Sequence, residues 1–514
     1  MRLSELHHIT MVTATNEGAR HEEHVPSASW RAWGVEPAPA SSSAGASVGD
    51  FRPLVPLALA QFAVVLSTSI VNVALPSIHS GLGLSPTGLT WVVNAYVLAF
   101  GGFLLAGGRA ADILGRRQVF MVSLAAFGIA SLAAALAPGA GSLIAARGLQ
   151  GVSAAVMSPS ALSIALTRYP DGDARRVALG IWGGVSGAGG AAGVIAGGLL
   201  TATFGWRSVF VVAVPVVIVA LAMSRSWVVA SPRPSERPAF DAPGALLVTG
   251  ALGLLTYGLA GATHGGWLSA RTIGLLAAGA LLLVAFVQVE RRSAAPLVHL
   301  RIFANPSVRF ANAAMTLVGG AWMGLFFFLP LYQQQVLGYG PLRTGLTQLP
   351  LAVTLMAASA YVRRITERMG TRKTLVASLL LLTVGLAWFG RVPVEGTFVA
   401  HLLGPSLLVG TGLGIASVEL TRLATHGVTL AESGLASGLV STTRQCGGAI
   451  GLALLMSLAA SRIGSAAEPG VAALTEGYRA AFLAASLLTG LAALLALRAP
   501  TLPAALASPV THNP

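Results

Sequence analysis

Long apolar segments constrain this chain more than any other feature of its sequence. A helix needs about 20 apolar residues to cross the hydrocarbon core of a bilayer. Segments of that kind follow one another along the chain, with short polar turns between them. We count fourteen, near residues 54–76, 87–107, 118–137, 142–166, 177–202, 208–229, 243–263, 272–289, 308–332, 343–362, 374–391, 397–418, 434–459 and 478–497. The pattern predicts an all-α membrane protein with 14 transmembrane helices.

Composition supports a membrane protein and argues against other classes. Only 10% of the 514 residues are charged, against about 25% in a soluble protein. The formal charge of +14 would suit nucleic acid, but the arginines are spread over short turns, so we expect no nucleic-acid partner. Cys446 is the only cysteine, which excludes an intrachain disulfide and a cysteine-based metal site. Abundant Ala, Gly and Arg beside a single lysine, Lys373, suggest a GC-rich bacterial genome.

Basic residues in alternate turns predict the orientation. One set of turns holds 18 Arg and Lys residues and the other holds six. Because cytoplasmic turns carry the excess of basic residues, the larger set marks the cytoplasm. An even number of helices then places both termini in the cytoplasm. We expect a multi-pass protein of the bacterial cytoplasmic membrane, embedded in the lipid bilayer as a monomer.

The ends of the chain differ from its middle. Residues 1–50 contain four histidines and a Pro/Ser/Ala-rich run without the apolar core of a secretory signal. The histidine spacing fits no metal-ligand motif, so we interpret residues 1–50 as a disordered tail. Residues 499–514 form a C-terminal tail, and the proline-rich residues 230–242 form an extended linker.

Two turns of the larger set share a pattern. Residues 107–117 read GGRAADILGRR, and residues 367–373 read ERMGTRK. Each has an acid, two residues, a glycine and then a basic pair, although the second is looser because Thr371 precedes its basic pair, and any arginine-rich turn is somewhat similar to another. The repeat predicts two related halves, residues 51–229 and 302–498. Residues 230–301, with the linker and two central helices, separate them.

Polar side chains within the apolar segments are the candidate site. Such residues are costly in a membrane, so they face protein or water and often mark function. Anchoring at the interface is the alternative for those near helix ends. The candidates for a substrate cavity or for coupling are Ser67, Asn72, Asn94, Arg147, Gln150, Gln334 and Arg444. Gly189, Gly193, Gly197 and Gly198 instead form a small-residue surface for close helix packing.

Several of these segments together resemble the fourteen-helix drug:proton antiporters of the major facilitator superfamily. The first turn is similar to that superfamily's G-x-L-x-D-R-x-G-R-R, with matches at Gly108, Asp112, Gly115, Arg116 and Arg117. Residues 70–76, IVNVALP, are similar to the end of the antiporters' helix 1 motif. Residues 147–151 match R-x-x-Q-G, and residues 189–198 match G-x-x-x-G-P-x-x-G-G except at Val194. The resemblance covers about residues 52–498.

The resemblance implies a fold and a mechanism. It implies two six-helix bundles that rock around a central cavity, with two inserted central helices. In this superfamily the acid of the first turn pairs with arginines and latches the inside-closed state, which would be the role of Asp112. The main departure is Ser67, where the antiporters have an aspartate that carries the proton. A hydroxyl does not change charge near neutral pH.

We therefore predict a secondary transporter that exports small hydrophobic or cationic compounds, driven by the proton-motive force without a cofactor or metal. If protons drive export, the titrating group is unusual, and Asp112, Glu419 and His401 are the candidates. Ser67 leaves open an uncoupled facilitator or a metabolite exporter of the same fold. An integral-membrane enzyme or receptor is the weaker alternative, because the first six helices contain no interior acid. The substrate itself is not predictable from one chain.

Overall fold

The computed structural model describes residues 51–169, 172–229, 241–293, 296–428, 430–464 and 470–500. In this part, 14 helices are long and apolar enough to cross a membrane, which confirms the predicted all-helical fold. Residues 1–50, the predicted linker up to residue 240 and the tail from residue 501 lie outside the described residues.

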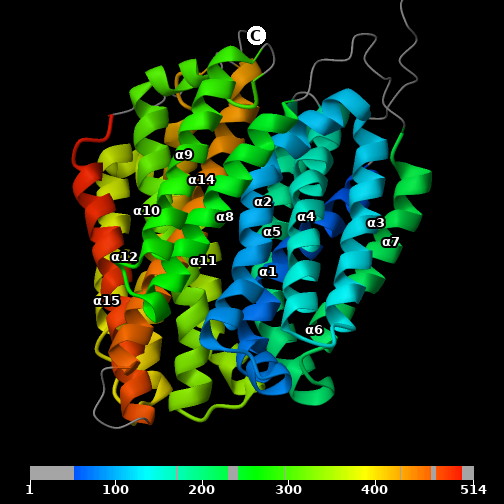
Figure 1. The fold of residues 1–514 in the computed structure, drawn as a ribbon. Helices are drawn as coiled ribbons and strands as arrows, with labels where there is room; N and C mark the ends of the chain where they lie inside the picture. Colours follow the sequence, from blue (N-terminus) through cyan, green and yellow to red (C-terminus); the bar gives the residue numbers. More distant parts are fainter. Residues whose placement is uncertain are drawn as a thin grey trace, which may run out of the picture. The chain divides into compact units, whose positions relative to one another are not determined.

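The elements of Figure 1 follow one another with short turns between them. The first seven are α1 (Leu54–Leu82), α2 (Pro86–Leu114), α3 (Arg116–Ala135), α4 (Ala140–Arg168), α5 (Gly172–Phe204), α6 (Ser208–Val211) and α7 (Ala213–Trp227). The next are α8 (Ala242–Gly265), α9 (Ala270–Arg292), the short turn η2 (Leu300–Ala304), α10 (Pro306–Leu331) and η3 (Tyr332–Val336). The last are α11 (Pro341–Met369), α12 (Thr371–Phe389), η4 (Phe398–Leu403), α13 (Gly404–Thr425), α14 (Leu430–Gly464) and α15 (Val471–Ala496). Helices α6 and α7 together make the sixth span.

Capping side chains explain where several helices begin. Ser85 accepts a hydrogen bond from the Gly88 N–H at the start of α2, and Asp241 accepts one from the Gly244 N–H at the start of α8. A proline lies in the first turn of both helices, where its missing N–H costs nothing. Capping satisfies N–H groups that have no partner within the helix.

Helix ends differ from the apolar limits that the sequence predicts. The first span was predicted to end near residue 76, yet α1 continues past Pro76 to Leu82. It ends at Gly83, which has φ +60° and donates its N–H to the His79 carbonyl. A glycine takes this left-handed conformation without strain, so the cap, and not the last apolar residue, ends the helix. The ninth span similarly extends from the predicted residue 332 to Val336 through the π-helical turn η3.

The two repeated turns have the same backbone feature. Gly115 separates α2 from α3 with φ +97°, and Gly370 separates α11 from α12 with φ +79°. Only glycine adopts such values readily, so both positions require it. We call the end of the protein with these turns the arginine-rich end; it is the upper end in Figure 1, and α6 lies at the opposite end.

Contacts divide the helices into two groups. In the first, α1 packs against α5 and α7, and α2 and α3 pack against α4. In the second, α10 packs against α14, and α13 packs against α11 and α12. The groups meet where α5 lies along α11 and where α2 lies along α14. We call them the first half and the second half.

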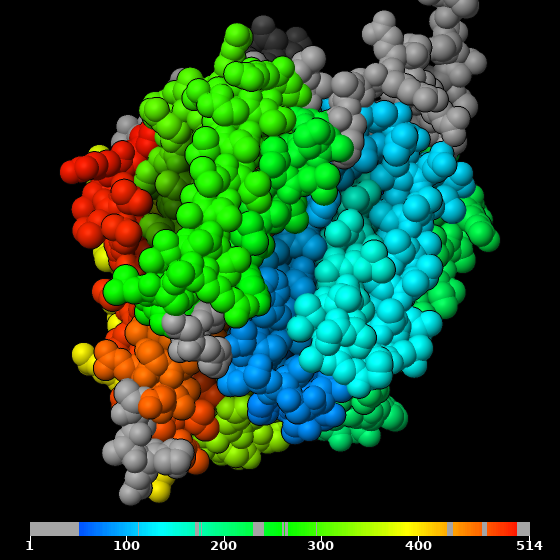
Figure 2. Space-filling model, in the orientation of Figure 1, coloured from blue at the N-terminus to red at the C-terminus, as the bar shows by residue number. Residues whose placement is uncertain are grey.

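Helices α8 and α9 pack against each other, and α8 also contacts α2 of the first half and α14 of the second half. Figure 2 shows this pair, in green, between the blue first helices and the orange and red last ones. Only 11% of the most apolar stretch of α9 is buried, the smallest share among the 14 described spans. A helix so exposed and apolar faces lipid. The pair therefore touches both halves through α8.

Candidate functional site

Arg147 and Gln150 form a buried network within the first half. Arg147, in α4, is 1% exposed. Its Nε donates to the Val92 carbonyl of α2 at 3.0 Å, and its Nη1 donates to Gln150 Oε1 at 2.6 Å. Gln150 Nε2 donates to Ser131 Oγ of α3 at 2.8 Å. The network fastens α4 to α2 and α3.

An aromatic ring lies beside the buried guanidinium. The Arg147 guanidinium carbon is 4.3 Å from the centroid of the Tyr96 ring, whose hydroxyl donates to the Val64 carbonyl of α1 at 3.3 Å. A desolvated cation over such a ring gains about 2 kcal/mol. The partners described for this charge are a ring face and neutral oxygens, with no carboxylate among them. In this structure Arg147 positions α1, α2 and α4; its role in a substrate cavity stays a prediction.

Asn94 and Gln334 bridge the two halves. Asn94 Nδ2 of α2 donates to the Ala449 carbonyl of α14 at 3.5 Å, and Gln334 Nε2 of η3 donates to the Val73 carbonyl of α1 at 2.8 Å. Asn94 Oδ1 is buried and has no partner among the described residues. A buried amide oxygen without a partner is available to a ligand or to water. These two predicted residues thus lie where the halves must part for the cavity to change sides.

The contact between α5 and α11 is confined to one part of both helices. A Cβ on Gly198 would lie 2.6 Å from the Pro341 carbonyl oxygen, and one on Gly345 would lie 2.6 Å from the Val194 carbonyl oxygen. Nearer the arginine-rich end, a Cβ on Gly183 or Gly184 would meet nothing within 4 Å. Along α5 and α11 the halves therefore touch away from the arginine-rich end, and α5 is uncovered towards that end. Along α2 and α14 they also touch nearer the arginine-rich end, where a Cβ on Gly438 would lie 3.1 Å from Leu105 Cδ2.

The other predicted glycines lie against α1. A Cβ on Gly193 would lie 2.7 Å from Ser69 Cβ, and one on Gly197 would lie 2.8 Å from the Ile70 carbonyl oxygen. Gly189 is less tight, because its Cβ would lie 3.1 Å from Val65 Cβ. Small residues on one face let two membrane helices approach closely.

The predicted latch makes contacts within the first half. Arg116 Nη1 donates to Thr167 Oγ1 of α4, and Arg117 Nη2 donates to the Arg225 carbonyl of α7 at 3.0 Å. Gly108 has ordinary contact with Pro159, since its Cβ would lie 3.7 Å away. The side chain of Asp112 lies outside the described part of the chain. The latch with Asp112 as its acid therefore stays a prediction.

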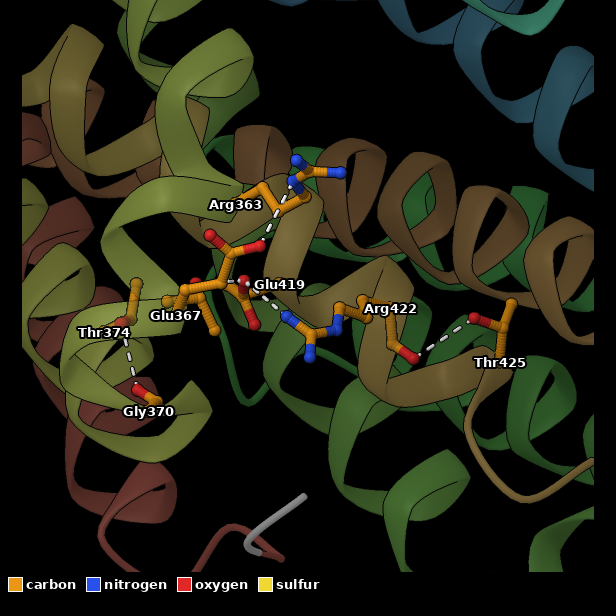
Figure 3. Close-up of polar contacts among 8 residues, drawn as sticks. Arg363, Glu367, Gly370, Thr374, Glu419, Arg422 and Thr425 are labelled. Atoms are coloured by element: carbon orange, nitrogen blue, oxygen red, sulfur yellow. Dashed lines mark hydrogen bonds and ion pairs between the residues drawn. The ribbon is translucent and has the colours of Figure 1, made fainter. Parts of the chain in front are cut away.

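Glu419 lies in the corresponding part of the second half (Figure 3). It is 1% exposed at the arginine-rich end of α13. Its Oε1 accepts a hydrogen bond from Thr366 Oγ1 of α11 at 2.6 Å and lies 3.5 Å from Arg422 Nη1. Its Oε2 is buried without a partner among the described residues. Figure 3 also shows the exposed pair Arg363–Glu367, 3.3 Å apart, near the repeated turn.

The remaining candidates are separated from one another. Ser67 and Asn72 are both buried in α1. The Arg444 guanidinium of α14 lies 5.3 Å from the Trp322 ring centroid of α10. The described partners of Glu419 are Thr366 and Arg422, and Arg444 is not among them.

His401 is remote from the arginine-rich end. It lies in η4, and its Nδ1 accepts a hydrogen bond from the Thr397 N–H at 3.1 Å. A pocket of about 600 Å³ also lies at the opposite end. Residues from α14 and α15 and from the turn after α12 line it, among them Arg391, Leu458, Arg462, Glu476, Arg479 and Leu483. None of the predicted cavity residues lines this pocket, so it is not the predicted cavity.

Sequence reasoning missed several residues of these networks. Ser131 and Thr366 are single hydroxyls in apolar helices, and such hydroxyls usually bond to their own helix. Ser131 also does so, donating to the Phe127 carbonyl at 2.7 Å. Their second partners come from helices distant in sequence, for which a single chain contains no signal.

Comparison with known proteins places the chain in one family. The sequence profile of the Major Facilitator Superfamily matches residues 57–452. The cephamycin export protein of Amycolatopsis lactamdurans is 42% identical, over 82% of this chain and 87% of that protein. The puromycin resistance protein of Streptomyces alboniger is 40% identical, over 78% of this chain and 80% of that protein. The tetracenomycin C resistance and export protein of Streptomyces glaucescens is 33% identical, over 84% and 79% respectively.

Solved structures with the same fold are more distant in sequence. An auto-inhibited peptide transporter of the POT family aligns with a TM-score of 0.64 and 16% identity, over 86% of this chain and 97% of that one. A bacterial homolog of the human lysosomal transporter Spinster, inward-facing and unoccupied, aligns with a TM-score of 0.64 and 16% identity, over 88% and 97%. At such low identity these structures show the shared fold alone.

Proposed function

The chain belongs to the major facilitator superfamily and is a drug-efflux transporter, and we propose that it expels small hydrophobic or cationic antibiotics by alternating access of its two halves. The similarity to cephamycin, puromycin and tetracenomycin C export or resistance proteins supports the substrate class. The observation that carries the mechanism is the confined contact between the halves, which touch along α5 and α11 only away from the arginine-rich end.

Rocking of the halves would use the contacts described above. With the halves closed at the opposite end, substrate enters from the arginine-rich end and lies near Asn94, Asn72 and Gln334. Closing that end must separate the hydrogen bond between Gln334 and Val73. The Arg147 network holds α1, α2 and α4 together, so the first half moves as a unit. Binding at the interface between two related halves suits such a motion.

We assign the arginine-rich end to the cytoplasm. The 18 to six distribution of basic residues supports this orientation. Both termini then lie in the cytoplasm, and the protein acts as a monomer in the bacterial cytoplasmic membrane. Drug resistance requires that the compound leave the cytoplasm, so export runs from the arginine-rich end towards the opposite end.

We favour proton antiport, in which the proton-motive force drives export and no cofactor is needed. Because Ser67 cannot ionise near neutral pH, another group must hold the proton. Glu419 is a candidate because it is buried with one oxygen unpartnered among the described residues. Uncoupled facilitated transport is the second candidate function, and the hydroxyl at Ser67 is the observation that favours it.

Inverted membrane vesicles distinguish the two. Puromycin or ethidium is supplied outside, an inward-acid pH gradient is imposed, and uptake is followed with and without an ionophore that collapses the gradient. Antiport predicts accumulation against the drug gradient that the ionophore abolishes. Uptake that is unaffected by the ionophore and stops at equal concentrations would identify a facilitator. Vesicles without the protein provide the baseline.

A further inference from the structure

Two buried carboxyl groups lie together in the inserted pair of helices. Asp241 precedes the first turn of α8, and Glu290 lies in the last turn of α9. They are 5% and 4% exposed. Neither belongs to the cavity or the latch discussed above.

Each acid uses one oxygen for the backbone and leaves the other without a partner. Asp241 Oδ1 accepts a hydrogen bond from the Gly244 N–H at 2.8 Å, and Glu290 Oε2 accepts one from the Val298 N–H at 3.1 Å. Asp241 Oδ2 and Glu290 Oε1 are buried and have no hydrogen-bond partner within the described part of the chain. A Cβ on Gly244 would lie 3.0 Å from Asp241 Oδ2 and 2.9 Å from Glu290 Oε1. The two free oxygens therefore flank the same point in space.

Two carboxylates in this position repel each other strongly, because burial removes the water that would screen them. One proton bound by the pair removes the repulsion. A metal ion is a poorer occupant, since hard cations require more oxygen ligands and no group of three or more His, Cys, Asp or Glu occurs among the described residues. We propose that Asp241 and Glu290 together bind one proton and form the coupling-ion site of this transporter, in which Ser67 occupies the position of the usual acid. This proposal rests on the proposed export function.

The surroundings supply one cation that can compete with the proton. Helix α2 lies along α8, with Gly102 against Thr249 and Ala106 in one apolar cluster with Ala245. One turn further, the same register brings Arg109 of α2 to the level of Asp241, and Arg109 Nε is buried without a partner in the described chain.

The other charged groups on the elements packed here do not compete for the pair. Those described near this end of α9, η2 and α10 are exposed: Arg291, Arg292, His299, Arg301 and Arg309. Arg444 of α14 lies against the Trp322 ring instead. The side chains of Asp112 on α2 and Glu432 on α14 lie outside the description.

The position of the pair connects it to the motion of the halves. The apolar cluster beside it joins Ala106 of the first half, Ala245 of α8 and Ala436 and Val308 of the second half. Movement of α2 relative to α8 therefore moves Arg109 relative to the acids. When Arg109 approaches, it favours the ionised pair, and the proton leaves to water at the arginine-rich end. When Arg109 moves away, the pair takes up a proton, which for antiport must come from the opposite side of the membrane.

Infrared difference spectroscopy tests the site without any substrate. The full-length protein in lipid nanodiscs is titrated from acid to alkaline pH, and the carbonyl band of protonated carboxyl groups is recorded. D241N and E290Q are the informative variants, because each amide oxygen still accepts the backbone hydrogen bond of the acid it replaces. E476Q is the matched control, since Glu476 is an exposed acid at the opposite end.

We expect a protonated carboxyl band that persists at neutral pH in the wild type, where exposed carboxyl groups are ionised. This band should be lost at neutral pH in both D241N and E290Q and retained in E476Q. If the band persists in both amide variants, or if the wild type lacks it, the proposal that Asp241 and Glu290 share a proton is refuted. G244A is a second test of the site. The added methyl group would force the two free oxygens apart and should shift or remove the band, while the helical backbone at this position accepts alanine.

Vesicle uptake separates this proposal from the export function. D241N and E290Q should retain downhill exchange of ethidium. The part of ethidium uptake that depends on the pH gradient should fall at least tenfold in both variants. Unchanged gradient-driven uptake in both variants would refute the coupling role. A wild type that does not transport at all would instead contradict the proposed function, and the infrared result would still decide whether the pair binds a proton.

Discussion

Two arginines of the first half make similar contacts at very different depths. Arg147 has an aromatic ring at 4.3 Å and a backbone carbonyl at 3.0 Å, and it is fully buried. Arg207 has the Trp206 ring at 4.3 Å and the Ala137 carbonyl at 3.2 Å, and it is exposed. The pair isolates the effect of burial, because the contact types are the same.

We expect R147K to lower the free energy of unfolding by about 1–3 kcal/mol, because one ammonium cannot reach both the Val92 carbonyl and Gln150, and a buried acceptor is left unpaired. R207K should change it by about 0.5 kcal/mol or less, since water replaces the lost partner. Denaturant titration in detergent micelles measures both variants. Equal losses would show that the buried network contributes nothing beyond its surface counterpart.

Ser67 is the residue at which coupling should respond to a single change. S67D restores the acid of the related antiporters at a buried position of α1. The added carboxyl can take up a proton, so drug uptake driven by an imposed pH gradient should rise several-fold. Flux measured in inverted vesicles at two gradients tests this. S69D is the control, because Ser69 lies two residues away and faces α5 at Gly193. An equal rise in both variants would show that the position of the added acid does not matter.

The sequence identified chemically unusual residues better than it identified their partners. Arg147 and Gln150 stand out as polar groups in an apolar segment, and the structure joins them. Asp241 and Glu290 did not stand out, because each lies at the edge of an apolar segment where acids are common. Their proximity depends on how α8 and α9 pack, which no local pattern records.

At the scale of the element, α5 contains two kinds of glycine. Gly193 meets Ser69 of α1 at 2.7 Å from its would-be Cβ, whereas Gly183 meets nothing within 4 Å. G193A should destabilise the protein by about 1–3 kcal/mol through overpacking. G183A should be neutral or stabilising by up to about 1 kcal/mol, because alanine favours the helix. Thermal unfolding in the same detergent compares them, and a loss at Gly183 as large as at Gly193 would refute the assigned packing face.

Helix positions were predictable from apolar length, but their ends were not. The α1 helix passes Pro76 because a membrane helix tolerates a proline when neighbouring groups satisfy the freed carbonyl. Its end is decided by the left-handed Gly83. The extension through η3 similarly places Gln334 on a π-helical turn, from which it reaches α1. Local backbone geometry, and not hydrophobicity, determines these details.

At the scale of the whole molecule, the number of spans followed from the sequence because lipid imposes a length on each helix. The grouping of helices around α8 did not, since it depends on contacts between distant segments. Orientation rests on the distribution of arginines, and it can be measured directly in cells.

Single cysteines introduced into a C446S background report the orientation. Glu367 at the arginine-rich end and Glu476 at the opposite end have similarly exposed side chains, 61% and 63%. A membrane-impermeant maleimide should label E476C in intact cells and E367C only after permeabilisation. The reverse pattern would invert the assigned orientation and with it the direction of transport.

Locking the two halves together tests alternating access most directly. A Cβ on Gly187 would lie 3.2 Å from the Met356 side chain across the α5–α11 contact, so G187C/M356C in the C446S background should form a disulfide on mild oxidation. If the halves must part there, cross-linking abolishes gradient-driven drug uptake in vesicles, a reductant restores it, and either single cysteine variant is unaffected by the oxidant. Uptake that continues at its full rate in the cross-linked protein would contradict export by rocking of two halves.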